Sequence, residues 1–135
     1  MLVLLDTDIC IHLINRRPAF ERVLRRLSGR SFGEICISAI TVSELHYGVA
    51  KSAKRAGNAA ALEAFLSRFE LLDYPVDAAE RYGSVRSQLE VLGKSIGNND
   101  LLIAAHALAI GARVATANKT EFERVPGLKA LDWLS

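Results

Sequence analysis

Three acidic residues, each at the point where an apolar run meets a helix-like pattern, are the residues of this chain best suited to chemistry. Asp6 closes the run MLVLLD, Glu44 comes shortly after ICISAIT, and Asp100 precedes LLIAAHALAI. If these runs are neighbouring parallel strands, their ends meet at the carboxyl edge of one sheet, where open α/β sheets bind ligands. Two carboxylates about 4 Å apart repel by about 4 kcal/mol at an effective dielectric constant of about 20. Such a cluster requires protonation or a divalent cation, and carboxylate oxygens are ligands that Mg²⁺ prefers.

Each acid alone also has an ordinary structural role. Asp6 suits the N-cap of a helix, since Asp accepts hydrogen bonds from the free amides at a helix start. Thr41 and Glu44 have the Thr-x-x-Glu spacing of a capping box. Asp100 in a first helical turn is favoured by the helix dipole, with Asn98 as the cap. None of these capping roles predicts the others, whereas a shared strand-to-helix edge accounts for all three acids.

Size and composition limit the class of protein. The chain has 135 residues, of which 50% are hydrophobic and 24% charged, and this is typical of one soluble globular domain. Its net charge of +2 is compatible with nucleic-acid binding. No apolar stretch approaches the roughly 20 residues of a membrane-spanning helix, and no basic leader precedes an apolar run. We therefore expect a single cytoplasmic domain over residues 1–135.

The cysteines and histidines do not form a metal-binding pattern. Cys10 and Cys36 lie in apolar contexts without a Cys-x-x-Cys motif, which is typical of buried thiols in a reducing compartment. His12, His46 and His106 are too far apart for a zinc motif, and no Cys stands at ligand spacing from them. We expect all three histidines to be structural or exposed.

Basic residues are concentrated in one short stretch that is opposed only by Glu21. They are either the solvated face of a helix or a contact surface for phosphates. Lys51, Lys54 and Arg55 are further candidates for contacts with an RNA backbone. The six arginines of the stretch are Arg16, Arg17, Arg22, Arg25, Arg26 and Arg30.

Short apolar runs alternate with segments of helical periodicity, which implies a parallel sheet with right-handed crossovers. Gly93 and Gly111 follow helical segments and suit C-terminal caps. The helix expected over residues 98–110 is apolar on nearly every face, so it should be buried in the domain or in a subunit interface. The predicted strands cover residues 2–6, 35–38, 70–72, 113–115 and 130–133, and the predicted helices cover 8–15, 19–27, 41–51, 58–69, 76–92 and 98–110.

Three segments that carry the acids resemble the successive motifs of PIN-domain ribonucleases, and most closely the VapC toxins of type II toxin–antitoxin systems. They read LLDTDICIHLI, ISAITVSELHYGV and GKSIGNNDLLIAAHALAIGARVATANKTEFERVPGL. The similarity extends from Leu4 to Trp133. It implies a PIN-like three-layer α/β/α domain with a central, mostly parallel sheet of four or five short strands. FELLDY and the ending EFERVPGL…DWL resemble the branch that cleaves initiator tRNA in the anticodon loop.

The resemblance also implies an activity and partners. The expected protein is a toxin that inhibits translation by hydrolysing phosphodiester bonds of RNA, with tRNA as the substrate. Asp6 and Asp100 would ligate Mg²⁺, for which Mn²⁺ can substitute, and Glu44 would ligate the metal or orient the attacking water. A cognate VapB-type antitoxin would push a basic side chain into this acidic site. A homodimer through apolar helical faces is expected as well.

The chain departs from the family pattern near its end. Asn118 stands where many PIN domains carry a fourth acid, and we predict it to be a catalytic residue that accepts a hydrogen bond from water or a substrate hydroxyl. Whether the site holds one metal or two stays open. Glu121 would supply the missing charge only if the segment after Asn118 folds back, which we do not expect. Asp8 stands where the family usually has Asn, and Thr7 and Thr116 are candidate hydroxyls for orienting the acids.

Two other classes of protein share parts of the pattern. VLLDTD fits a haloacid-dehalogenase-type phosphatase with Asp6 as nucleophile and Asp8 as acid. That class also needs an acidic pair after a late strand, and NKTEF supplies none. The other alternative is a non-catalytic PIN-fold module that binds RNA or a protein, and the neutral Asn118 motivates it.

Overall fold

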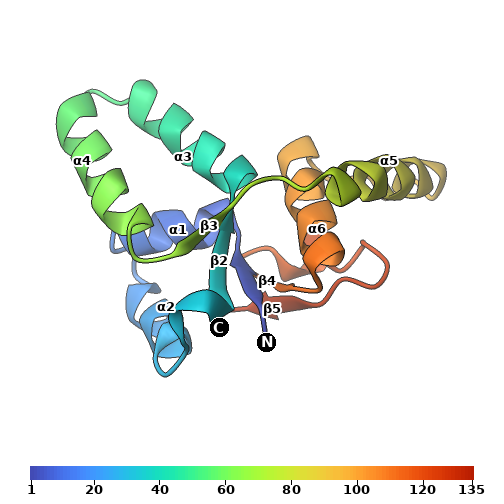
Figure 1. The fold of residues 1–135 in the computed structure, drawn as a ribbon, viewed down its shortest axis with the longest axis horizontal. Helices are drawn as coiled ribbons and strands as arrows, with labels where there is room; N and C mark the ends of the chain where they lie inside the picture. The colour runs from blue at the N-terminus through green and yellow to red at the C-terminus, as the bar shows by residue number, and fades with distance from the viewer.

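Strands and helices alternate along the chain in the computed structural model, which describes residues 1–135 (Figure 1). The strands are β1 (Val3–Leu5), β2 (Ile35–Ser38), β3 (Glu70–Leu72), β4 (Arg113–Thr116) and β5 (Ala130–Asp132). The helices are α1 (Thr7–Ile14), α2 (Phe20–Leu27), α3 (Ala39–Ala50), α4 (Arg55–Leu66), α5 (Val76–Val91), α6 (Asn98–Ile110) and α7 (Lys119–Phe122), with one 3-10 turn, η1 (Phe32–Glu34). None of the helices is long and apolar enough to cross a lipid bilayer.

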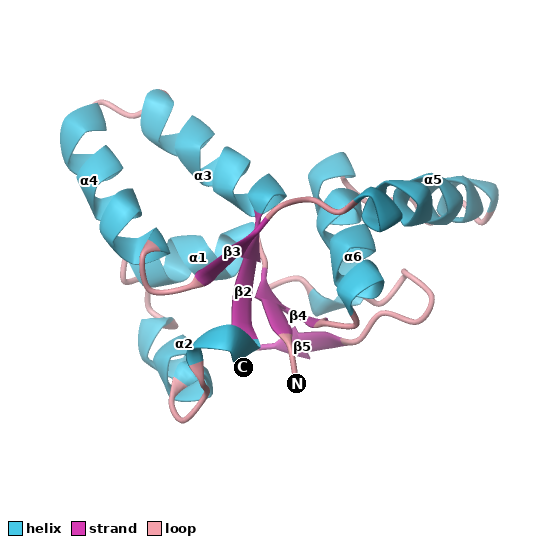
Figure 2. Ribbon diagram, in the orientation of Figure 1, coloured by secondary structure: helices cyan, strands magenta, loops and turns pink.

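All five strands are parallel and pair in the order β3-β2-β1-β4-β5. β1 is therefore central, and the carboxyl ends of all strands lie at one edge of the sheet. β1 leads directly into α1 and β2 directly into α3 at that edge (Figure 2). The predicted sheet is confirmed, and it is wholly rather than mostly parallel.

Side chains alternate between two hydrophobic cores, one on each face of the sheet. Val3 and Leu5 of β1 join the core under α1 to α4, whereas Leu4 joins the core under α5, α6 and α7. This alternation is the period of two that a strand imposes on its side chains. It produces the predicted three-layer α/β/α arrangement, with the site edge lying between the two helical layers (Figure 1).

Helix α6 has more buried residues than any other helix of the domain, as its largely apolar composition predicts. It begins and ends at the predicted residues, and it stops at Gly111, whose φ of 69° is left-handed. Such a conformation favours glycine at a helix end. The buried residues of α6 are Leu101, Ile103, Ala104, Ala105, His106 and Ala107.

Two kinds of element differ from the predictions. α3 begins two residues earlier than predicted because the Ser38 hydroxyl accepts a hydrogen bond from the Ile40 amide at 3.1 Å and caps the helix. α4 lies three residues closer to the N-terminus than the predicted range 58–69. The turn η1 and helix α7 were not predicted at all, since three or four residues are too few to show a period.

Candidate active site

Asp6 lies at the carboxyl end of the central strand and caps α1, as one of its two interpretations predicted. It is only 4% exposed. Its Oδ1 accepts a hydrogen bond from the Ile9 amide at 2.9 Å, and its Oδ2 accepts one from the Thr116 hydroxyl at 2.5 Å. Its own amide donates to the Ala115 carbonyl of β4 at 3.0 Å. Burial raises the pKa of Asp6 to about 6, although the hydrogen bonds from Thr116 and Ile9 act in the opposite direction.

Glu44 projects from α3 towards the same edge. Its Oε1 accepts a hydrogen bond from the Thr7 hydroxyl at 2.6 Å, and Thr7 also lies 3.4 Å from the Thr41 hydroxyl. The capping box of Thr41 and Glu44 does not form, because Ser38 is the N-cap of α3. The structural role that sequence spacing suggested for Glu44 is therefore wrong, and its carboxylate is available to the site.

Asp100 stands in the first turn of α6, whose N-cap is Gly97 rather than the predicted Asn98. Its carboxyl group has acidic neighbours only. Burial, followed by the charges of Glu121 and Asp6, a hydrogen bond with Glu121 and the charge of Glu44, raises the pKa of Asp100 to about 7. The three predicted acids thus face one another across the sheet edge, and each raises the cost of ionising Asp100.

Glu121 is a fourth acid of this site, and our expectation that its segment would not fold back is wrong. Helix α7 turns Glu121 towards Asp100, and the Gly97 amide donates to its Oε1 at 3.1 Å. The Asn118 side-chain amide donates to its Oε2. A signal for this arrangement was present in the sequence, because Asn118 and Glu121 have the spacing of an N-cap residue and the third helical position.

Thr7 and Thr116 contact the acids that they were predicted to orient. Thr116 is fully buried. Its hydroxyl donates a hydrogen bond to Asp6 and accepts one from the backbone amide of Asn118 at 2.8 Å. Asn118 therefore lies beside the site, with its side chain committed to Glu121. Its predicted contact with water or substrate stays a prediction.

The charge of the site is not compensated by the protein. None of the four carboxylates of Asp6, Glu44, Asp100 and Glu121 forms an ion pair with Lys, Arg or His. They also do not form a closed metal cage, since no group of three His, Cys, Asp or Glu side chains is close enough to hold a metal ion as it stands. The donor set of oxygens without an internal counter-ion fits a hard divalent cation.

Asp8, by contrast, directs its charge away from the site. Its carboxylate is 48% exposed and lies 3.9 Å from Arg17 and 4.0 Å from the Nδ1 of His12. The added negative charge of this position is thus balanced outside the cluster, although it contributes a little to the raised pKa of Asp6.

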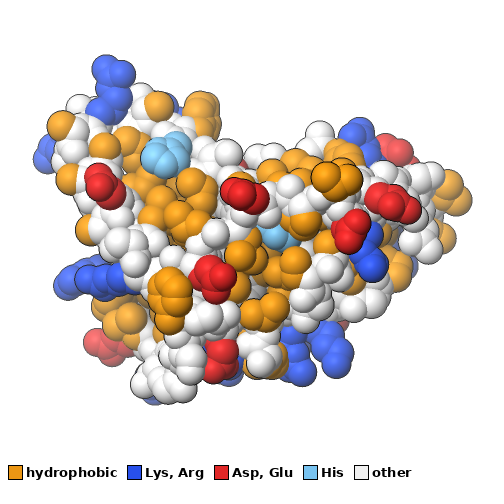
Figure 3. Space-filling view, in the orientation of Figure 1, with side chains coloured by type: hydrophobic (Ala, Val, Ile, Leu, Met, Phe, Trp, Pro, Cys, Tyr) orange, Lys and Arg blue, Asp and Glu red, His pale blue; other side chains and the backbone are white.

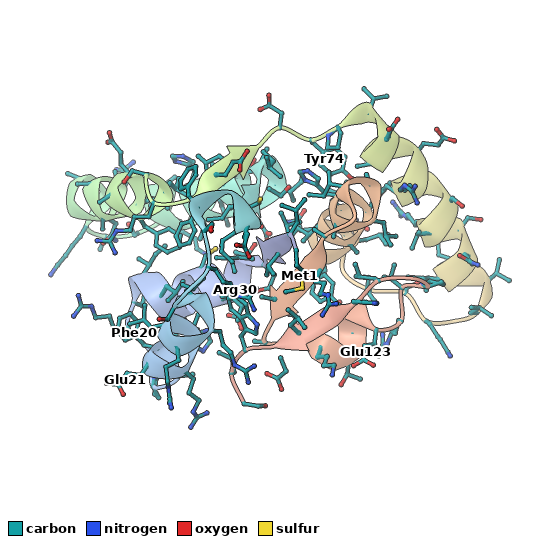
Figure 4. The ribbon with its side chains drawn as sticks, turned by 60° about the horizontal axis from the view of Figure 1, so that its bottom comes forward. Met1, Phe20, Glu21, Arg30, Tyr74 and Glu123 are labelled. Atoms are coloured by element: carbon teal, nitrogen blue, oxygen red, sulfur yellow. The ribbon has the colours of Figure 1, made fainter.

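A buried hydrogen bond connects the two helices that carry Glu44 and Asp100. The Ser38 hydroxyl, which caps α3, lies 2.8 Å from the Nδ1 of His106 on α6. His106 is 1% exposed, burial lowers its pKa, and its Nε2 has no partner. Tyr74 packs edge-on against the imidazole at 5.3 Å and lies beside α6 in Figure 4. His106 is the structural histidine that was predicted.

The cysteines and part of the arginine stretch make structural contacts. Cys10 and Cys36 are buried and unpaired, as predicted. Several members of the arginine stretch contact other parts of the protein, and whether the stretch also contacts phosphates stays a prediction. Arg22 donates to the Leu134 carbonyl at 2.6 Å, and the guanidinium of Arg30 lies 5.4 Å from the centre of the Trp133 ring.

Comparisons with known proteins agree with this fold. The model of the family described as PIN domain matches residues 3–128. The chain is 43% identical over 134 residues to ribonuclease VapC2 of Rickettsia felis, covering 98% of each chain. It is 42% identical over 130 residues to the tRNA(fMet)-specific endonuclease VapC of Shigella flexneri, covering 96% of each. It superposes on a chain of the DNA-bound VapBC structure from Salmonella typhimurium with a TM-score of 0.91 and 42% identity, covering 98% of this chain and 99% of that one.

Proposed function

Because this chain belongs to the PIN-domain family and, within it, to the VapC ribonucleases, we propose that it is the ribonuclease toxin of a toxin–antitoxin pair and cleaves RNA at the carboxyl edge of its sheet. One observation carries this proposal. Four carboxylates from α1, α3, α6 and α7 converge at that edge without a cationic side chain to neutralise them. A purely structural cluster would gain nothing from leaving these charges unpaired.

PIN-domain nucleases depend on a divalent metal, and we propose Mg²⁺ for this chain, with Mn²⁺ as a substitute. Asp6, Glu44 and Asp100 would hold the ion. Glu121 supplies the fourth negative charge that Asn118 lacks. A bound Mg²⁺ contributes Lewis-acid chemistry, because it activates water and neutralises charge on the phosphoryl oxygens.

The residues of the chain have separate tasks in this proposal. Thr116 and the Ile9 amide hold both oxygens of Asp6 in fixed directions. Thr7 engages Oε1 of Glu44, so Oε2 is free to ligate or to accept a proton from the attacking water. Asp100, whose pKa is raised to about 7 and which forms a hydrogen bond with Glu121, would lose its proton on binding a cation.

The proposed substrate is tRNA. Relatives of 42% identity from Shigella flexneri and Salmonella typhimurium bear the name tRNA(fMet)-specific endonuclease, and the initiator tRNA anticodon loop is the specific target that we propose. An enzyme of this kind selects an RNA loop by its shape and by bases that are splayed out of the stack.

The proposed partner is a VapB-type antitoxin, since the neighbouring structures are VapBC assemblies. A basic side chain of that partner would satisfy the same uncompensated carboxylates, so antitoxin and metal should compete. Equal antitoxin affinity with and without Mg²⁺ would contradict this. The homodimer and the single domain over residues 1–135 also stay predictions, and light scattering tests the first.

The deciding experiment is cleavage of total tRNA by antitoxin-free protein with Mg²⁺, with Mn²⁺ and with a chelator. Discrete metal-dependent fragments that vanish in Asp100→Asn would establish the nuclease, and sequencing their ends would identify the RNA. Asp77→Asn is the matched control, because Asp77 occupies the first turn of α5 as Asp100 does that of α6, but is exposed. Folded protein that binds RNA and metal without cleavage would favour the non-catalytic module instead.

A further inference from the structure

A cleft of about 330 Å³ lies between α1, α3 and α4 and borders the acidic site, because Glu44 is one of its lining residues. Gly48 follows Glu44 by four residues on α3, so the two share one face of the helix, and Ser52 lies just beyond the end of α3 on the same cleft wall. One helical turn rises about 5.4 Å. The cleft therefore leads outward from the catalytic edge along α3, and its first opening lies one turn from the Glu44 carboxylate.

The lining of this cleft has an apolar floor and a polar rim. Leu45 and Leu62 on the floor are buried. The rim carries Asn15, Arg17 and Asn58. The Asn58 amide nitrogen donates to the Ser52 hydroxyl at 3.0 Å, so its carbonyl oxygen is free to accept a hydrogen bond. Flat apolar faces with a polar edge are the chemistry of a nucleobase.

The glycine at position 48, in the wall of this cleft, is not required by the fold. It lies inside α3 with ordinary helical backbone, where glycine is the least favourable residue after proline. A Cβ at this position would meet nothing within 4 Å. The same is true of the helical Gly57 and Gly83, but of the three only Gly48 lines the cleft, where the missing side chain leaves the wall open beside Glu44.

Charge favours RNA rather than a peptide as the occupant. Arg17 stands on the rim, and Lys51, Lys54 and Arg55 lie where α3 turns into α4. Figure 3 shows Lys and Arg side chains at that outer end of the helix pair. The adjacent cleft of about 430 Å³ between α1, α2 and α4 differs, since its lining is almost wholly hydrophobic and includes no site acid.

We propose that the cleft along Glu44, Gly48 and Ser52 receives the unstacked base of a nucleotide next to the cleaved phosphodiester bond. Asn15 and Asn58 would read the edge of that base, since each amide both donates and accepts hydrogen bonds. Arg17, held by Asp8 at 3.9 Å, would contact the adjoining phosphate. This inference rests on the proposed ribonuclease function and adds to it the group that selects the cleavage site.

The test uses the anticodon stem–loop of initiator tRNA and two copies of it with an abasic nucleotide on one side or the other of the mapped cut. Gly48→Leu fills the cleft, and Gly83→Leu is the matched control, since Gly83 is also helical with nothing within 4 Å of its Cβ position. For the wild type, removing the recognised base should lower kcat/KM about tenfold. Gly48→Leu should cleave the intact RNA about tenfold less efficiently and show no further loss on the abasic RNA. Gly83→Leu should retain the wild-type discrimination.

Binding of the same RNAs to Asp100→Asn protein separates this inference from the proposed function. If the Asp100→Asn protein binds intact RNA more tightly than RNAs with single abasic nucleotides in the anticodon loop, and Gly48→Leu in the same background removes that preference, the cleft is upheld even when the wild type does not cleave and the ribonuclease proposal fails. Wild-type discrimination that is unchanged in Gly48→Leu overturns the cleft. The cleft proposal is also overturned if Gly48→Leu weakens binding of an antitoxin and leaves RNA binding unchanged, because the occupant of the cleft is then a protein.

Discussion

Asp6 and Asp100 lie at the same edge of the sheet, but the protein treats their carboxyl groups differently. Asp6 follows the central strand, is nearly inaccessible, and receives hydrogen bonds from Ile9 and Thr116 on separate oxygens. Asp100 stands at a helix start, is partly exposed, and shares a hydrogen bond with another acid, Glu121. The carboxylate of Asp6 is therefore surrounded by hydrogen-bond donors, whereas the carboxyl group of Asp100 has other acids as its neighbours.

The difference shows which half of the site the fold fixes by itself. The oxygens of Asp6 are directed by the backbone and by Thr116 whether or not a metal is bound. The arrangement of Asp100 and Glu121 depends on a proton, which a cation would replace. We therefore describe the site as a rigid half around Asp6 and an adaptable half around Asp100.

The largest expected effect is that of Asp6→Asn, which removes a charge from the rigid half. Activity should fall on the order of 10³-fold, as for other losses of a fixed electrostatic group. The fold should persist, because Asn is as good an N-cap as Asp. Single-turnover cleavage and thermal unfolding measure the two effects. An Asp6→Asn protein with more than one tenth of the wild-type activity would contradict this view of the rigid half.

Thr116→Val tests whether the second contact of Asp6 matters. The change keeps the shape of the side chain, but it removes the donor to Asp6 and the acceptor of the Asn118 amide. Loss of such a supporting residue typically costs about 10- to 100-fold in activity or metal affinity. Thr120→Val is the control, since Thr120 is exposed. Equal activities of the two variants would show that Asp6 is held well enough without Thr116.

Glu121→Gln addresses the adaptable half and should have a smaller effect of another kind. Gln can still accept the hydrogen bond from the Gly97 amide, so the geometry is retained while one charge is lost. We expect the Mg²⁺ concentration for half-maximal cleavage to rise about tenfold, with little change in the rate at saturation. Glu123→Gln, on the exposed side of the same segment, is the control. A lower saturating rate would instead place Glu121 in the rigid half.

The smallest expected effect is the pH dependence of stability without metal. The pKa values of Asp6 and Asp100 are raised from 3.8 to about 6 and about 7. The folded state therefore binds more protons than the unfolded state between pH 4 and pH 7, so stability is highest below this window and is lost as pH rises through it. The Tm of the metal-free protein should fall by several degrees from pH 5 to pH 8.

Magnesium should reverse that loss, because it binds the ionised carboxylates of the folded state only. The Tm gained from Mg²⁺ should increase with pH, and Asp100→Asn should flatten the metal-free profile. Glu34 and Asp132, whose pKa values are lowered by hydrogen bonds, affect stability only below about pH 5. His106, whose pKa is lowered by burial from 6.5, acts against the two site acids, because its contribution to stability is lost as pH falls below that value. A metal-free Tm that does not change between pH 5 and pH 8 would contradict the prediction.

Sequence patterns predicted the parts of this molecule that depend on long periods or strong boundaries. Helix α6 was predicted to the residue, because the nearly wholly apolar run over residues 101–110 follows a polar start and ends at a glycine that suits the left-handed conformation. Contacts of Thr7 and Thr116 with the acids were also predicted, since hydroxyls next to converging acids are natural donors, but which acid each contacts came from the structure.

What the sequence did not reveal depends on short elements and on competition between caps. Helix α7 is only four residues long, so its period is invisible, and with it the return of Glu121 to the site was missed. The capping box of Thr41 and Glu44 was a reasonable interpretation of the spacing. Ser38, three residues earlier than Thr41, captured the start of α3 instead, and nothing in the local pattern ranks the two hydroxyls.

The double role of Asp6, as a helix cap and as a site residue, affects how this sequence can change in evolution. The same carboxylate caps α1 and faces the metal site, so selection for folding alone would retain a cap-forming residue there after activity was lost. The presence of an aspartate at this position is therefore weak evidence for catalytic activity in a related chain. Asp100 accepts no capping hydrogen bond in its helix, where Gly97 is the N-cap, and its ionisation destabilises the metal-free fold. A lineage that no longer cuts RNA would be free to discard Asp100 first.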